Sequence, residues 1–347
     1  MKTTILLAAS LFAVATLHAQ SFTAAPGSST RQLFNLGEGT TISALGASAG
    51  GDLFYLATGS FEGPEPGTQL FRASPSDNYQ TRTSLFSYRT AADQPSARFG
   101  SFVRVEGDTV YFGESSNGEI RSIPIGGGVS GVLRTVPNHY DAAVIGGSLL
   151  VSAANADFSD NQVYRLTSSP APLDRIVNTG GASGPVTADA AGNLIYGATT
   201  FNGGTGGLYR FSSAQVAGAT DANPTTGDRV LALTEGTRLF ASGEFAFSGT
   251  NQYLAYRDEA HLFQASSGST ASVMRFNLTN STSEPVGQAG AGNFFGGLAA
   301  SNSGLFVAVT ADFFSGPSAV FLIIPEPSTA VLTLLGGLAL GVVRRRR

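Results

Sequence analysis

The chain has 347 residues, of which 13% are charged, 44 are glycine and none is cysteine, and its formal net charge is −4. The lack of cysteine excludes a disulfide framework, and the few scattered basic side chains argue against nucleic acid as a partner. Abundant glycine, little charge and 42% hydrophobic residues in short runs predict a packed fold of short strands and tight turns rather than a disordered chain.

The first element is an apolar run, Ile5–Leu17, which follows Lys2 and precedes small residues. This order is typical of a secretory signal peptide, so we expect signal peptidase to remove residues 1–19 after Ala19, with a cut after Ala15 as the alternative. A retained anchor is the competing interpretation, but the run is shorter than the roughly 20 residues of a membrane-spanning helix. The rest of the chain is therefore expected to be exported.

A repeated pattern runs through residues 20–324. Each copy has a glycine or polar turn, a short apolar run, a small polar loop and a second run with alternating side chains, which together predict a β-hairpin. The clearest copies are Gly51–Ser74 and Gly192–Ser213, and weaker ones begin at Gly107, Gly147, Asn251 and Ser303. A further short run precedes the hairpin, for example at 99–105, 141–145 and 244–248. Often another follows it, so the unit has four antiparallel strands.

Four-stranded units repeated in this way are typical of β-propeller blades. We place six of them near residues 41–90, 95–138, 139–180, 181–236, 240–290 and 291–324. The last unit reaches Pro325 before a fourth strand can form, while the run Arg31–Leu36 precedes the first full unit. We therefore predict an all-β fold, a six-bladed β-propeller whose last blade is closed by an N-terminal strand. A β-helix and two stacked sandwiches are the alternatives.

The copy Gly192–Ser213 resembles a tandem repeat of exported bacterial proteins, roughly G-N-L-Y-G-T-T, then glycines, then G-T-V-F-K-L. Here Gly192–Gly197 carries an additional isoleucine, and Leu208–Phe211 stands where the family has V-F-K-L. The resemblance implies extracellular repeat blades and no particular activity.

Phenylalanine recurs at corresponding places in four hairpin loops, as Phe61, Phe158, Phe201 and Phe313. On a propeller these loops would emerge on one face, and exposed aromatic rings there would form a binding surface. The competing interpretation is that each ring folds back into its own blade.

Other patterns indicate turns rather than sites. Gly46–Gly50 matches a nucleophile elbow and Gly126–Gly131 matches a dinucleotide-binding loop, but a strand follows each where a helix is required. We expect His139 to be a hydrogen-bonded loop histidine beside Asp141, and His261 to lie on a strand surface.

No cofactor is expected. Calcium is the alternative, because Asn155, Asp157, Asp160 and Asn161 could present oxygen ligands from one loop. Their spacing does not match an EF-hand, and a solvated polar hairpin is the simpler interpretation. Without cysteine, and with two histidines after the leader, a structural zinc site is not expected.

The final element joins the sequence PEPS, the apolar run Ala330–Val343 and an arginine cluster. As a helix the run would span about 21 Å, less than the roughly 30 Å hydrocarbon core, and the arginines would stay on the cytoplasmic side. We predict a short hydrophobic helix outside the domain, in a segment covering residues 325–347. An ordinary single-pass anchor is the alternative to a processed segment.

This order closely resembles the PEP-CTERM sorting signal of Gram-negative bacteria that make exopolysaccharide. The motif residues are Pro325, Glu326, Pro327, Ser328, Arg344, Arg345, Arg346 and Arg347. The resemblance implies transient attachment to the inner membrane, processing by an exosortase and delivery to the cell surface or extracellular matrix.

We therefore expect a non-catalytic binding or structural propeller at the cell surface or in a biofilm matrix, with exopolysaccharide or a surface protein as its partner. The alternative is a secreted enzyme that cleaves polysaccharide or esters with acidic residues near the propeller channel.

Overall fold

A computed structural model gives the structure of the chain. It describes residues 20–37, 39–59, 68–88, 100–114, 117–156, 160–166, 171–180, 184–189, 191–198, 207–221, 224, 228–232, 252–256, 261–266, 271–277, 282–311 and 316–325. The expected leader and the expected C-terminal helix lie outside these residues. Within them, no helix has the length and apolar character needed to cross a bilayer.

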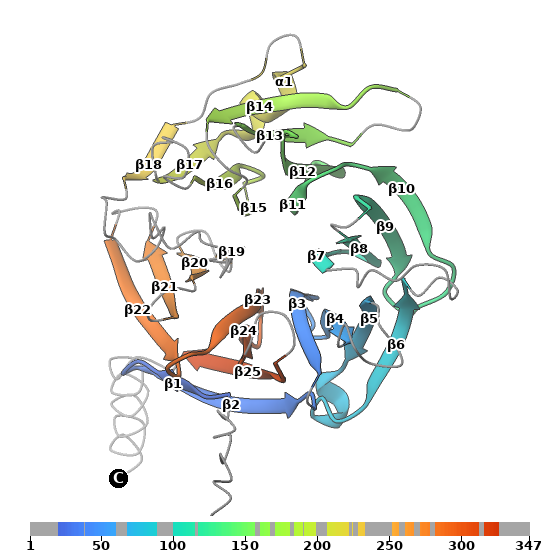
Figure 1. Cartoon of the computed structure of the whole chain (residues 1–347). Coiled ribbons are helices and arrows are strands. Elements are labelled where there is room, and N and C mark those ends of the chain that lie inside the picture. Colours follow the sequence, from blue (N-terminus) through green and yellow to red (C-terminus); the bar gives the residue numbers. More distant parts are fainter. Residues whose placement is uncertain are drawn as a thin grey trace, which may run out of the picture.

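Six antiparallel sheets form a ring (Figure 1). The first sheet contains β3 (Thr40–Ala47), β4 (Leu53–Gly59), β5 (Thr68–Ala73) and β6 (Arg82–Ser87). The second sheet contains β7 (Gly100–Glu106), β8 (Thr109–Glu114), β9 (Glu119–Pro124) and β10 (Gly131–Thr135). The third sheet contains β11 (His139–Ile145), β12 (Ser148–Ala154), β13 (Asp160–Arg165) and β14 (Asp174–Gly180).

The other three sheets complete the ring. The fourth sheet contains β15 (Val186–Ala188), β16 (Leu194–Ala198), β17 (Gly207–Phe211) and β18 (Asp228–Ala232). The fifth sheet contains β19 (Gln252–Tyr256), β20 (His261–Ser266), β21 (Ser272–Asn277), β22 (Thr282–Ala289) and β1 (Phe22–Ala24). The sixth sheet contains β23 (Phe294–Ser301), β24 (Gly304–Thr310), β25 (Ser318–Pro325) and β2 (Ser28–Asn35). The strands β3, β7, β11, β15, β19 and β23 lie innermost (Figure 1). The short helices are η1 (Pro75–Asp77) and α1 (Ser213–Gly218).

The predicted six-bladed propeller is confirmed, and the β-helix and stacked sandwiches are excluded. The predicted limits of the blades agree with the sheets. The run at 244–248, expected as the first strand of the fifth blade, lies outside the described residues, and β19 is the innermost of the strands described in that sheet.

The core lies between neighbouring blades, because each sheet packs both of its faces. The second strands show this most clearly: β4 and β24 are buried along almost their whole length. One cluster joins Phe54 and Leu56 of the first blade to Val103 and Phe112 of the second. Strands buried on both faces read as continuous apolar runs, which is why these segments stand out in the sequence.

The N-terminal segment Phe22–Asn35, which we call the clasp, holds the fifth and sixth blades together. Its strand β1 pairs with β22, and β2 pairs with β25 from Ser28 opposite Pro325 to Asn35 opposite Ala319. The Phe22 ring lies 6.4 Å from that of Phe295 and 6.1 Å from that of Phe321. The prediction that an N-terminal strand completes the last blade is therefore confirmed.

Neighbouring inner strands run in the same direction around the ring. Gly100 of β7 approaches Ser43 of β3, and three residues further along both strands Val103 approaches Gly46. The same chain order in each sheet gives every blade this orientation. We call the end of the ring where the inner strands begin the entry face, and the end where they finish the opposite face.

We predict that Phe22→Ala, which empties the contact between the clasp and the sixth blade, lowers the free energy of unfolding by about 3 kcal/mol. Urea denaturation measures the change. Val129→Ala is the matched control, because Val129 is 90% exposed and its truncation should change stability by less than about 0.5 kcal/mol. Equal effects of the two substitutions would show that the clasp does not stabilise the ring.

Candidate binding face

The entry face is where the second strand of each blade ends and the third begins. The four loop phenylalanines, Phe61, Phe158, Phe201 and Phe313, lie in the segments between β4 and β5, β12 and β13, β16 and β17, and β24 and β25. These phenylalanines are outside the described residues, but the strand ends that flank them all belong to the entry face. Their role in binding stays a prediction.

The segment predicted to be a sorting motif begins on the opposite face. Pro325 is the last residue of β25, and the other motif residues, Glu326–Ser328 and Arg344–Arg347, lie outside the described residues.

Buried polar side chains gather at the entry face. Thr58 and Thr68, which flank the first of these segments, share a hydrogen bond of 2.8 Å between their hydroxyl oxygens. Thr41 of β3 donates from its hydroxyl to the Gly316 carbonyl at 3.0 Å. Other members are Glu114, His139, Thr310 and Ser318. Hydrogen bonds of this kind fix the strand ends from which the loops leave.

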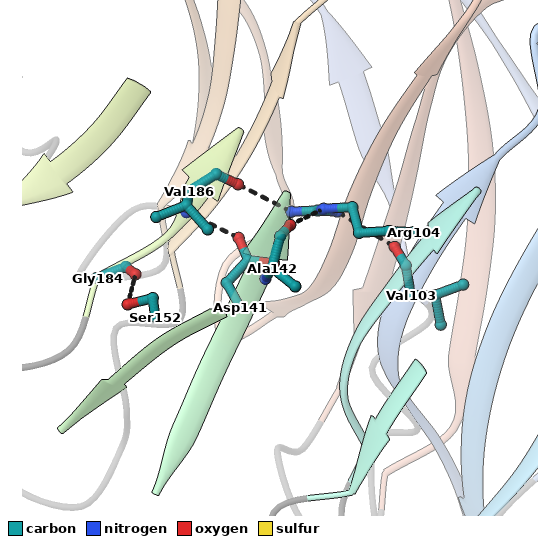
Figure 2. Close-up of polar contacts among 7 residues, drawn as sticks. All are labelled: Val103, Arg104, Asp141, Ala142, Ser152, Gly184 and Val186. Carbon is teal, nitrogen blue, oxygen red and sulfur yellow. Dashed lines mark hydrogen bonds and ion pairs between the residues drawn. The ribbon is translucent and has the colours of Figure 1, made fainter. Parts of the chain in front are cut away.

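Behind the entry face, an ion pair links the inner strands of three blades (Figure 2). Arg104 of β7 donates from Nη2 to Asp141 Oδ1 of β11 at 2.6 Å and to the Val186 carbonyl of β15 at 3.1 Å. Its Nε donates to the Ala142 carbonyl. Asp141 accepts from the backbone N–H of Ala142 at 2.8 Å and of Val186 at 3.0 Å.

Burial raises the pKa of Asp141, and the Arg104 guanidinium and the two backbone N–H groups oppose that effect. The side chains of Arg104 and Asp141 are only 20% and 8% exposed. Both carboxylate oxygens are engaged, so the pair acts as a polar clamp between blades rather than as a free acid or base. Sequence analysis placed both residues in strands but did not pair them.

His139 differs from the prediction, because it begins strand β11 rather than lying in a loop, and it is only 3% exposed. Its Nδ1 donates to the Val136 carbonyl at 2.8 Å, and its ring meets Phe102 edge-on. Desolvation lowers its pKa to about 4. The imidazole is therefore neutral near pH 7. His261 lies in β20, as expected of a strand residue.

The two glycine-rich motifs are turns. Ser48, the serine of the elbow pattern, accepts from the Asp52 backbone N–H at 3.0 Å in the turn between β3 and β4. The segment Gly126–Gly131 connects β9 with β10 and reaches the first residue of that strand. Neither motif precedes a helix, which confirms the interpretation from sequence.

The residues considered for calcium do not share one loop. Asp160 and Asn161 are in β13, Asn155 follows β12, and Asp157 lies outside the described residues. The part of the chain that the structure describes holds no group of three or more His, Asp or Glu side chains arranged for a metal ion.

No protein-family model matches the chain, and no curated protein matches it. Among solved structures it is similar to the gluconolactonase XC5397 from Xanthomonas campestris, with 13% identity, 89% of this chain and 94% of that chain covered, and a TM-score of 0.53. It is also similar to a luciferin-regenerating enzyme, with 10% identity, coverage of 86% and 95%, and a TM-score of 0.54.

A third similar structure is the PQQ-bound aldose sugar dehydrogenase from Streptomyces coelicolor. It shares 13% identity over 87% of this chain and 100% of that chain, with a TM-score of 0.50. At such identities these likenesses show the propeller fold alone.

We predict that Asp141→Ala destabilises the protein by about 3 to 5 kcal/mol, because it leaves the Arg104 charge without its partner. The double substitution Arg104→Met with Asp141→Leu should recover part of this loss. Chemical denaturation of the single and double variants measures both values. Asp221→Ala is the control, since the Arg175–Asp221 pair is more exposed and should contribute less than about 1 kcal/mol. A double variant that is no more stable than Asp141→Ala would contradict a coupled pair.

We predict that acid destabilises the fold through His139. The unfolded chain binds a proton at this histidine near pH 6.5 but the folded chain only near pH 4, so stability falls between these values by about 3 kcal/mol as the pH drops. In His139→Asn the side-chain amide can still reach the Val136 carbonyl. Between pH 7 and pH 4 this variant should lose about 3 kcal/mol less stability than the unsubstituted protein. Identical pH profiles for the two proteins would be the contrary result.

Proposed function

We propose that this protein is an exported, exosortase-processed β-propeller that acts without catalysis as a binding module of the cell surface or extracellular matrix. Its entry face contacts the partner, which is exopolysaccharide or another surface protein. The leader and the C-terminal segment direct export and sorting in a Gram-negative bacterium, and signal peptidase and exosortase remove them.

One observation carries the binding part of this proposal. The segments with Phe61, Phe158, Phe201 and Phe313 all connect a second strand to a third, and the strand ends beside them meet at one end of a closed ring. Aromatic side chains brought to one face of a rigid scaffold supply large contact area with little loss of conformational entropy.

The arrangement of charge at the centre of the ring favours binding over catalysis. Among the residues that the structure describes, the inner strands contain two acidic side chains, Asp141 and Glu106. Asp141 is held by Arg104 and two backbone N–H groups, and Glu106 ends β7 at the opposite face. Glycoside hydrolysis needs two carboxyl groups that flank one bond. The alternative of a secreted enzyme with acids near the channel therefore has less support from these strands.

The processing part of the proposal rests on the PEP-CTERM resemblance and on where the domain ends. Strand β25 finishes at Pro325, the first residue of the motif. The ring is closed by the described strands up to Pro325, so the proposal places the following residues after the domain, where a membrane enzyme could reach them.

Replacing Phe61, Phe158, Phe201 and Phe313 together by serine tests the binding proposal. Loss of several aromatic anchors should lower retention on matrix isolated from the source organism by roughly tenfold or more. A sedimentation assay with purified matrix measures retention of the secreted protein.

Val129→Ser is the matched control, because this exposed valine lies on the opposite face, between β9 and β10, and its substitution should not change retention. Circular dichroism checks that both variants are folded, and intact mass checks that they are processed at the same sites. Unchanged retention of the folded fourfold variant would refute the role of the entry face.

A further inference from the structure

The last strand leaves the ring on the side away from the predicted binding loops. Strand β25 begins at Ser318, beside Thr41 and Gly316 on the entry face, and runs to Pro325 on the opposite face. There it pairs with Ser28, the first residue of β2. The direction of β25 is fixed by two neighbours, β2 and β24, so its exit point is fixed as well.

Little chain separates that exit from the apolar segment. Four residues, 326–329, lie between Pro325 and Ala330, so five Cα–Cα steps join the two, and a fully extended chain spans at most about 18 Å between them. While the apolar segment is in a membrane, the opposite face of the ring must therefore lie close to the bilayer surface.

We infer that the membrane-attached protein stands with its opposite face toward the bilayer and presents its entry face, with the phenylalanine-bearing segments, outward. This inference rests on the proposed membrane attachment of the C-terminal segment and adds an orientation to it. The face that contacts lipid headgroups consists of the turns after the first strands, such as Gly107–Asp108 and Asn302–Ser303. The outward face is free to meet matrix before the protein is released.

The N-terminal end of the domain adds a condition to this orientation. Gln20 accepts at Oε1 from Asn35 Nδ2 at 3.3 Å, and Asn35 ends β2 on the entry face. The eight residues of β2 separate the two faces by about 26 Å. An uncut leader and the C-terminal segment would thus emerge from opposite faces, so both could enter one membrane only if the clasp came apart. The orientation therefore requires removal of the leader.

The chain has no cysteine, so single introduced cysteines can report the orientation directly. Ala291→Cys and Asn302→Cys place exposed labels in the turns on either side of β23, at the entry face and the opposite face. Asp108→Cys and Asn117→Cys flank β8 in the same way and supply a second, independent pair.

Each variant is produced without its leader, with residues 325–347 intact, and inserted into phospholipid vesicles that contain a headgroup-linked quencher. We expect a fluorophore at 302 to be quenched at least twofold more than one at 291, and 108 more than 117. Equal or reversed quenching in protein that floats with the vesicles would overturn the orientation while leaving membrane attachment intact. Protein that does not float with the vesicles would instead overturn the attachment and, with it, this inference.

A glycine-serine insertion of about 20 residues between Pro325 and Glu326 serves as the control. It leaves the ring and the apolar segment unchanged but removes the short connection. The difference between 291 and 302 should disappear in this variant. A difference that persists would show that the ring binds lipid by its own surface and not through the short tether.

Discussion

Antiparallel pairing between β2 and β25 is the constraint on which the ring depends. Each blade buries both faces against its neighbours, so a sixth blade with only three strands would leave apolar side chains and a sheet edge uncovered. The clasp supplies the missing strand from the other end of the domain, and Leu33 of β2 joins Val320 and Tyr55 in one cluster between the sixth and first blades. The closed ring then brings the second-to-third-strand connections of all blades to one end.

Two kinds of contact join neighbouring blades inside the ring, close approaches at glycine and hydrogen bonds from arginine. Glycine at close contacts removes a side chain where two inner strands approach: a Cβ atom at Gly297 would lie 2.7 Å from the Leu45 nitrogen. Arginine then binds across the interface, as Arg104 does at the centre and as Arg165 does toward the Val216 carbonyl of the next blade. The side chains of Arg104, Asp141 and Arg165 therefore contribute to the contacts between blades.

The propeller fold could be predicted from the sequence because the alternation that marks a β-hairpin is a local pattern. The pairing of an N-terminal strand with the last blade could be predicted because the C-terminal unit lacks a fourth strand and the N-terminal end has one strand too many. The strand predicted at 244–248 stays a prediction, because that run lies outside the described residues. The Arg104–Asp141 clamp could not be predicted, since 37 residues separate its members and only the ring brings them together. The prediction of a loop at His139 was wrong, because β11 begins at the histidine itself.

Closing the ring with the first strand of the domain has a cost during folding. The strand β2 is synthesised before β25 and has no partner until the last blade is complete, so its edge is exposed to other chains in the interval. Its composition limits that hazard. The strand reads Ser-Ser-Thr-Arg-Gln-Leu-Phe-Asn, and Leu33 is its one residue buried below a tenth of its surface in the folded ring. While β2 is unpaired, its mostly polar side chains keep it soluble. Its few apolar contacts form only when β25 pairs with it.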